Sequence, residues 1–141
     1  MIIKFFIRCG SLLICMITAW MLYFSNAQQV MANINDGVII EHLRLSVPSD
    51  KRDAWLKAER GSWEPWLLQK EGFLGRQLYW DDQNEVAVLL ITWKNKTTWK
   101  AISQTEIDQV QKSFEALARK ETGILKGNPF PLQFEGELYP Q

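Results

Sequence analysis

Residues 59–93, ERGSWEPWLLQKEGFLGRQLYWDDQNEVAVLLITW, decide the fold of this chain. The first part ends a helix, whereas residues 73–80 and 85–93 are rich in aromatic and β-branched residues and predict two strands. The turn-forming residues 81–84, DDQN, join these strands. Four of the seven tryptophans of the chain lie here, and they are Trp63, Trp66, Trp80 and Trp93. This aromatic density predicts a core or a pocket.

The helix before these strands is predicted to break in the middle. Pro65 would clash with the carbonyl group of Gly61, so the helix should kink or restart between them. Ser62 is placed to cap the second part, and Gly72 is a natural left-handed stop. One stripe of the helix, at spacings of four, four and three, carries Trp55, Glu59, Trp63 and Trp66.

Residues 38–47, VIIEHLRLSV, predict a strand that precedes this helix. Its alternation places Ile39, Leu43, Leu45 and Val47 on one face, and Val38, Ile40, His42 and Arg44 on the other. Residues 86–91 are apolar without alternation, which in a strand indicates that both faces of the sheet are covered.

The C-terminal half predicts two helices and a strand. Residues 95–102 form a short helical turn that carries Trp99, and a capping box of Ser103 and Glu106 opens a long helix. Gly123 should end that helix. Residues 130–139 predict a last strand with Phe130, Leu132, Phe134, Gly136 and Leu138 on one face, and Pro129 and Pro131 confine it to a sheet edge.

The order strand, helix, strand, strand, helix, strand is the split β-α-β pattern of an α+β ferredoxin-like fold with a four-stranded antiparallel sheet. In its usual strand order, 4-1-3-2, the first and third strands are central. Two helices cover only one face of such a sheet, and the second face is also apolar. Exposing it would cost roughly 25 cal/mol per Å². We therefore predict a homodimer whose sheets pack face to face.

Residues 1–27 predict an apolar helix that serves as an export signal. Lys4 and Arg8 supply its positive start, residues 11–24 its apolar run, and residues 25–27 a cleavage site. The alternative is an uncleaved transmembrane anchor, because the apolar segment nearly reaches spanning length. In both cases the following domain is exported, to the periplasmic or extracellular side, and if the segment is not cleaved, residues 1–27 alone contact the membrane.

A polar tether over residues 28–37 leads into a single folded domain, residues 38–141. The chain has 16 basic and 16 acidic residues, so nothing in its charge favours nucleic acid as a partner. Both cysteines lie within residues 1–27, and His42 is the only histidine. We therefore expect no metal site and no cofactor.

Three segments carry a resemblance to a known family: VPSDKRDAWLKAE at 47–59, SWEPWLLQKEGFLGRQLYW at 62–80 and EVAVLLITWKNKTTWKAI at 85–102. They resemble a cyanobacterial family of uncharacterised small proteins related to the antibiotic-biosynthesis-monooxygenase-like (ABM-like) dimeric α+β barrels. The resemblance covers about residues 39–102, and residues 72–75 and 99–102 are its most specific parts.

This resemblance implies the fold and dimerisation but no single reaction, since the superfamily includes cofactor-free monooxygenases, isomerases and haem-degrading enzymes. Haem-degrading relatives carry a helical histidine and an asparagine on the first strand. This chain has no histidine after His42 and no asparagine in residues 38–47, so we discount haem degradation.

Two residues are candidates for proton transfer. Glu59 shares a stripe with three tryptophans, which would raise its pKa and make it a base. Alternatively, Glu59 accepts a hydrogen bond from an indole N–H or forms an ion pair with a nearby arginine. His42 titrates near neutrality, but a lone strand histidine is more often a packed residue. The two should lie on opposite sides of the sheet, and so do not form a dyad.

The tryptophans suggest a flat slot for a ligand, with core filling as the alternative. The expected slot consists of Trp55, Trp63, Trp66 and Trp99. We predict a small homodimeric protein that binds an apolar or aromatic molecule, or serves as an interaction module, without turnover. The alternative is a cofactor-independent monooxygenase or isomerase acting on an aromatic or polyketide-like substrate, with Glu59 or His42 moving a proton.

Overall fold

The computed structural model describes residues 37–141. The predicted signal or anchor, and all but the last residue of the tether, lie outside the described residues. Within residues 37–141, none of the helices combines the length and the apolar character that crossing a membrane requires.

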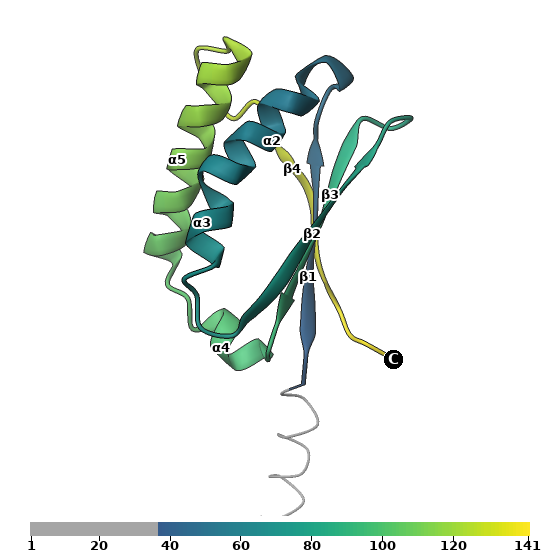
Figure 1. Ribbon diagram of the computed structural model, residues 1–141, viewed down its shortest axis with the longest axis vertical. Coiled ribbons are helices and arrows are strands. Elements are labelled where there is room, and N and C mark those ends of the chain that lie inside the picture. Colours follow the sequence, from purple (N-terminus) through teal and green to yellow (C-terminus); the bar gives the residue numbers. More distant parts are fainter. Residues whose placement is uncertain (1–36) are drawn as a thin grey trace, which may run out of the picture. The chain divides into compact units, whose positions relative to one another are not determined.

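Four antiparallel strands form one sheet, and the helices lie against one of its faces (Figure 1). The strand order β2-β3-β1-β4 puts β1 and β3 in the centre and β4 at an edge, which confirms the predicted α+β ferredoxin-like fold. In chain order the elements are β1 (Ile39–Ser46), a 3-10 turn (Ser49–Lys51), α2 (Arg52–Gly61), α3 (Trp63–Leu67), β2 (Phe73–Asp81), β3 (Val86–Trp93), α4 (Lys96–Lys100), α5 (Gln104–Thr122) and β4 (Leu132–Leu138).

The predicted break in the first helix is confirmed, because α2 ends at Gly61 and α3 begins at Trp63. The predicted role of Ser62 is wrong. Its hydroxyl donates to the carbonyl oxygen of Ala58 at 2.6 Å and makes no bond to the N-terminus of α3. Serine hydroxyls commonly bond to the carbonyl four residues earlier, and here that bond satisfies the end of α2 instead.

Capping signals elsewhere agree with the structure. The Ser103 hydroxyl accepts from the backbone N–H of Glu106 at 3.3 Å and donates to its carboxylate at 3.1 Å, which confirms the capping box of α5. Gly123 ends α5 with a φ of 74°. The Asn95 side chain caps α4, accepting from the N–H of Thr98 at 2.8 Å. These local contacts fix the first residue of α4 and both ends of α5.

The face assignment of the last strand is wrong beyond its first residues. Leu132 pairs with Leu45, whereas Phe134 pairs with the preceding residue Arg44, so β4 contains one extra residue at this point. This bulge reverses the alternation. Leu132 therefore faces the helices, while Phe134 lies on the opposite face of the sheet.

That opposite face carries no helix from the described residues, and we call it the open face. Along β3 the residues alternate between buried and half-buried, and those that point to the open face are Val86, Val88, Leu90 and Thr92. Ile40, Phe134 and Leu138 add to this apolar surface, and 45% of Phe134 is exposed. The sheet is thus apolar on both faces, as expected from residues 86–91.

Candidate functional site

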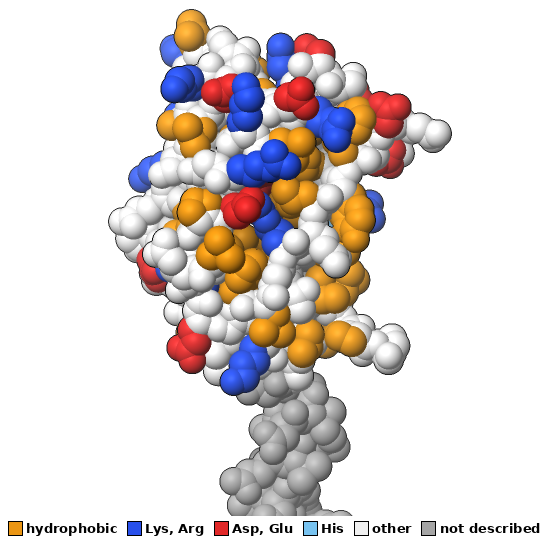
Figure 2. Space-filling view, viewed as in Figure 1, with side chains coloured by type: hydrophobic (Ala, Val, Ile, Leu, Met, Phe, Trp, Pro, Cys, Tyr) orange, Lys and Arg blue, Asp and Glu red, His pale blue; other side chains and the backbone are white. Residues whose placement is uncertain are grey.

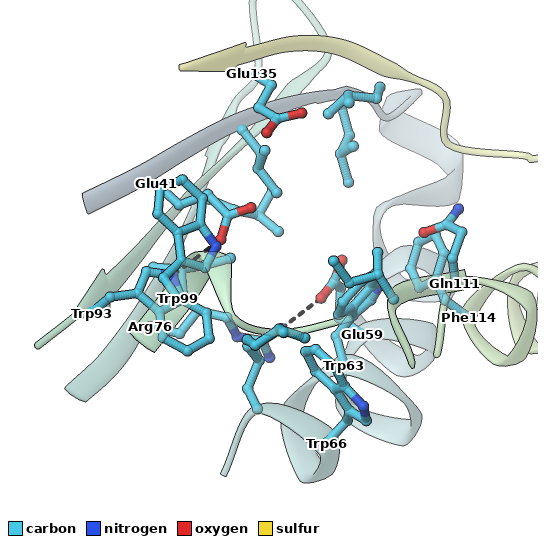
Figure 3. A pocket seen from close by; sticks show the side chains of 18 of the residues that line it. Glu41, Glu59, Trp63, Trp66, Arg76, Trp93, Trp99, Gln111, Phe114 and Glu135 are labelled. Carbon is cyan, nitrogen blue, oxygen red and sulfur yellow. Dashed lines mark hydrogen bonds and ion pairs between the residues drawn. The ribbon is translucent and has the colours of Figure 1, made fainter. Parts of the chain in front are cut away.

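A cavity of about 410 Å³ lies between the sheet and the helices (Figure 3). Its size falls within the range of small-molecule sites, which runs from about 300 to 1,000 Å³. Every strand and every helix from α2 to α5 contributes to its wall. The aromatic part of the wall is formed by Trp63, Trp66, Trp93, Trp99, Phe114 and Phe130. The charged side chains are Glu41, Glu59, Arg76, Lys100 and Glu135.

The tryptophans form two pairs of different geometry. Trp93 of β3 and Trp99 of α4 lie nearly parallel, with ring centroids 6.3 Å apart and planes 12° apart. Trp63 and Trp66 of α3 meet edge to face, with centroids 5.4 Å apart. Both arrangements are favourable for aromatic rings. Two tryptophan pairs therefore form much of the aromatic lining of the cavity.

One expected ligand-binding residue, Trp55, does not line the cavity. It is only 1% exposed and packs in the core with Ala58 and Phe114. Trp63, Trp66 and Trp99 do line the cavity. Trp93, which was not among the expected ligand-binding residues, belongs to the hydrophobic core and also lines the cavity.

Glu59 and Arg76 form a buried ion pair at one side of the cavity (Figure 3). Arg76 Nη1 donates to Glu59 Oε2 at 2.6 Å, and Nη2 donates to Glu64 Oε2 at 3.1 Å. The side chains of Glu59 and Arg76 are 1% and 7% exposed. Two structural roles were considered for Glu59, a hydrogen bond from an indole and an ion pair with an arginine. The structure shows the ion pair.

The pKa of Glu59 is raised to about 7, because burial disfavours the carboxylate more strongly than Arg76 favours it. The indole N–H of Trp55 also lies close enough to favour the ionised form. It does not make a hydrogen bond of regular geometry, however. Glu59 thus titrates near neutrality within a fixed ion pair.

Glu41 is a second cavity carboxylate, and our sequence analysis missed it. Its Oε2 accepts a hydrogen bond from Trp93 Nε1 at 3.2 Å. Burial is the largest effect on the pKa of Glu41 and raises it to about 7. The hydrogen bond from Trp93 and the positive charge of Lys100 lower this pKa, whereas the negative charge of Glu135 raises it. The signal was present, since residue 41 lies between Ile39 and Leu43 on the helix-facing side of an alternating strand.

The cavity opens between β4 and α5. Its exposed wall residues there are Glu135 and Leu132 of β4, of which Leu132 is 50% exposed, and Gln104 of α5. Glu59 lies away from this opening and is almost inaccessible to solvent. A ligand that enters at β4 would therefore meet Glu135 before it reaches the ion pair.

A second hollow lies outside the ion pair, along the β2 edge, where Glu64, Leu68 and Leu74 contribute to its wall. Arg76 lines both hollows and so lies between them. On this side of the molecule, hydrophobic side chains flank a central group of basic and acidic ones (Figure 2). The ion pair thus closes the cavity toward β2.

His42 lies on the open face and does not line the cavity. Its Nε2 accepts from Arg44 Nε at 3.3 Å, and its ring packs 5.1 Å from that of Phe134. Partial burial, and then the charge of Arg44, lower its pKa. His42 and Glu59 are on opposite sides of the sheet, as predicted, and they form no dyad.

Residues 37–141 contain no group of three or more histidine, cysteine, aspartate or glutamate side chains arranged to hold a metal ion. Beside aliphatic side chains, those at the cavity are carboxylates, a guanidinium, an ammonium, three amides and aromatic rings. This set can bind a ligand by hydrogen bonds, charge and stacking, and its carboxylates can accept a proton.

No protein-family model matches the chain, and no curated protein matches it in sequence. Solved structures do match. A candidate monooxygenase from Shewanella loihica PV-4 superposes with a TM-score of 0.50 at 14% identity, over 75% of this chain and 96% of that one. A candidate antibiotic biosynthesis monooxygenase from Bordetella bronchiseptica gives 0.51 at 14% identity, over 74% and 98%. The domain has the fold of these ABM-like proteins. At this level of identity, the likeness concerns the fold alone.

Proposed function

We propose that the protein binds a small, mainly apolar aromatic molecule in the cavity between its sheet and its helices. The observation that carries this proposal is the cavity of about 410 Å³ with four tryptophans in its wall. Large rings offer flat apolar contact area, and a few charged groups among them orient the ligand. Core packing alone would have left no space of this size, since protein interiors are close-packed.

The test is direct detection of a bound molecule. Purified protein is denatured, and the small molecules that it releases are identified by mass spectrometry. The variant Leu132→Trp should block the opening of the cavity and lose the molecule. Leu125→Trp is the matched control, because Leu125 is 90% exposed in a loop and does not line the cavity.

Trp63→Ala should also lose the molecule, because it removes a cavity wall. If Leu132→Trp and Trp63→Ala both retain as much as the wild type, the molecule binds elsewhere and the proposed site is wrong. If wild type releases nothing and binds no aromatic probe in calorimetry, the proposal fails.

The protein is further proposed to act as a homodimer that covers the open face. Val88, Leu90 and Phe134 make this face apolar, and no helix of residues 37–141 shields it. A second copy offers the same surface and can cover it around a two-fold axis. Sedimentation should show a dimer, and Val88→Lys should shift it to a monomer. The control Leu125→Lys places the same charge in an exposed loop, and should leave the dimer intact.

Export is proposed on the basis of residues 1–27. N-terminal sequencing of protein from the producing cells would distinguish the two forms: a start at Gln28 shows cleavage, whereas an intact N-terminus in the membrane fraction shows an anchor. Recovery of the intact chain in the cytosol would contradict export.

A second candidate function is supported by the two carboxylates whose pKa values are raised to about 7. A carboxylate of this basicity inside an aromatic cavity can accept a proton from an acidic phenol or carbon acid, as a cofactor-independent monooxygenase or isomerase requires. Glu41 is the better base, since Glu59 is held by Arg76. His42 has no part in this proposal. Wild type should consume oxygen with naphthalene hydroquinones, and Glu41→Gln should lose this activity.

A further inference from the structure

The three carboxylates of the cavity differ in how they are neutralised. Glu59 is paired with Arg76 at 2.6 Å. Glu41 accepts a hydrogen bond from an uncharged indole, at 3.2 Å, and from no other group of the described chain. The side chain of Glu135 makes no hydrogen bond or ion pair with any residue within 37–141, although its backbone pairs with Leu43 in the sheet. Two of the three carboxylates thus have no cationic partner in direct contact.

The two cations of the cavity wall are directed elsewhere. Arg76 divides its guanidinium between Glu59 and Glu64. Lys100 Nζ lies 3.6 Å from the centroid of the Trp99 ring and 3.6 Å from Glu137 Oε1, and Glu137 does not line the cavity. Lys100 still attracts the negative form of Glu41 from a distance. The wall formed by β1 and β4 therefore carries negative charge without a matching contact.

Glu41 and Glu135 come from neighbouring strands and point into the same space (Figure 3). Each repels the ionised form of the other, since the charge of Glu135 raises the pKa of Glu41. The parallel rings of Trp93 and Trp99 lie beside Glu41. Aromatic faces attract organic cations, and such an attraction strengthens where water is excluded. Carboxylates and indole rings thus face the same part of the cavity, next to β1.

We propose that the ligand of this cavity is an aromatic amine or another organic cation, with its positive group between Glu41 and Glu135 and its rings against the tryptophans. The inference rests on the proposed function, ligand binding in this cavity, and adds the chemical class. A cation relieves the repulsion between the two carboxylates and supplies the donor that both lack. A neutral phenol can donate one hydrogen bond only, and an anion adds to the repulsion.

Three probes with the same ring system test the proposal on the full-length protein. They are 1-naphthylmethylammonium, which is a cation, 1-naphthalenemethanol, which is neutral, and 1-naphthoate, which is an anion. Calorimetric titration at about pH 8 is carried out above the raised pKa of Glu41, which is about 7, and keeps the amine charged. We expect the cation to bind at least about tenfold more tightly than the alcohol, and the anion to bind most weakly.

Charge-neutral variants assign the preference to the two carboxylates. Glu41→Gln and Glu135→Gln should each reduce the advantage of the cation several-fold and change the affinity for the alcohol little. Glu71→Gln is the control, since Glu71 is an exposed carboxylate that does not line the cavity. It removes the same charge from the protein and should keep the full preference. Circular dichroism confirms that each variant is folded.

Each outcome decides between the two levels of the proposal. If the alcohol binds as tightly as the cation, the ligand class is wrong while binding in the cavity stands. If no probe binds, the proposed function fails as well. If the cation is preferred but both glutamine variants retain that preference, another part of the protein binds the positive group of the ligand and the inference is overturned.

Discussion

Replacing Arg76 with leucine should destabilise the protein more at about pH 8 than at about pH 5, because of the carboxylate that it leaves behind. Glu59 is 1% exposed and has no other cation in hydrogen-bonding contact. At either pH the variant loses two hydrogen bonds and the packing of the arginine stem, for which we expect about 2 kcal/mol. The additional loss at higher pH depends on the pKa of Glu59.

In the folded wild type this pKa is raised from 4.5 to about 7. The folded state thus holds the proton to a higher pH than the unfolded chain, and stability is lost as pH rises from 4.5 to about 7. Without Arg76 the folded pKa rises further, so the loss continues above pH 7. It grows by about 1.4 kcal/mol per pH unit, which brings the total cost to about 3 kcal/mol at about pH 8.

Urea unfolding followed by tryptophan fluorescence, at one fixed protein concentration, measures the destabilisation by Arg76→Leu at both pH values. The double variant Glu59→Gln/Arg76→Leu should lose the difference between the two pH values, because no titrating group remains in the pair. Glu64→Gln is the control: Glu64 is half-exposed, and its loss should cost less than about 1 kcal/mol at both pH values. Equal destabilisation of Arg76→Leu at both pH values would refute a carboxylate of raised pKa at this site.

Three further predictions concern stability. Burial raises the pKa of Glu41 from 4.5 to about 7. As pH rises across that range, the free energy of unfolding of wild type, measured in urea, should fall by about 3 kcal/mol more than that of Glu41→Gln. Gly72→Ala should cost about 2–3 kcal/mol, against about 1 kcal/mol for Gly127→Ala. Both glycines have positive φ, but only at Gly72 would the added methyl group collide with Thr98; equal thermal shifts would exclude the collision. Ser103→Ala should cost about 1 kcal/mol in urea unfolding, since it removes the cap of α5.

The sequence determined the order of the elements, the break between α2 and α3, the caps of α5 and the position of β4 at the sheet edge. Each of these follows from local chemistry. Pro65 lacks an N–H and collides with the turn before it, and Pro131 cannot extend a ladder on both sides. Ser103 and Gly123 act within one turn of the helix that they bound. The hydrophobic periodicities of two residues for a strand and 3.6 residues for a helix are equally local.

Only the tertiary structure decided which side chains share the cavity. Arg76 reaches Glu59 across 17 positions of the chain, and Trp93 reaches Glu41 across 52. Sequence spacing places Trp55 and Trp63 on one helical stripe, but they lie in α2 and α3 and only Trp63 lines the cavity. The packing of the helices on the sheet separates the two, and one extra residue in β4 turns Phe134 toward the open face. These outcomes depend on how distant segments meet, and a periodic pattern carries no information about the partner across the interior.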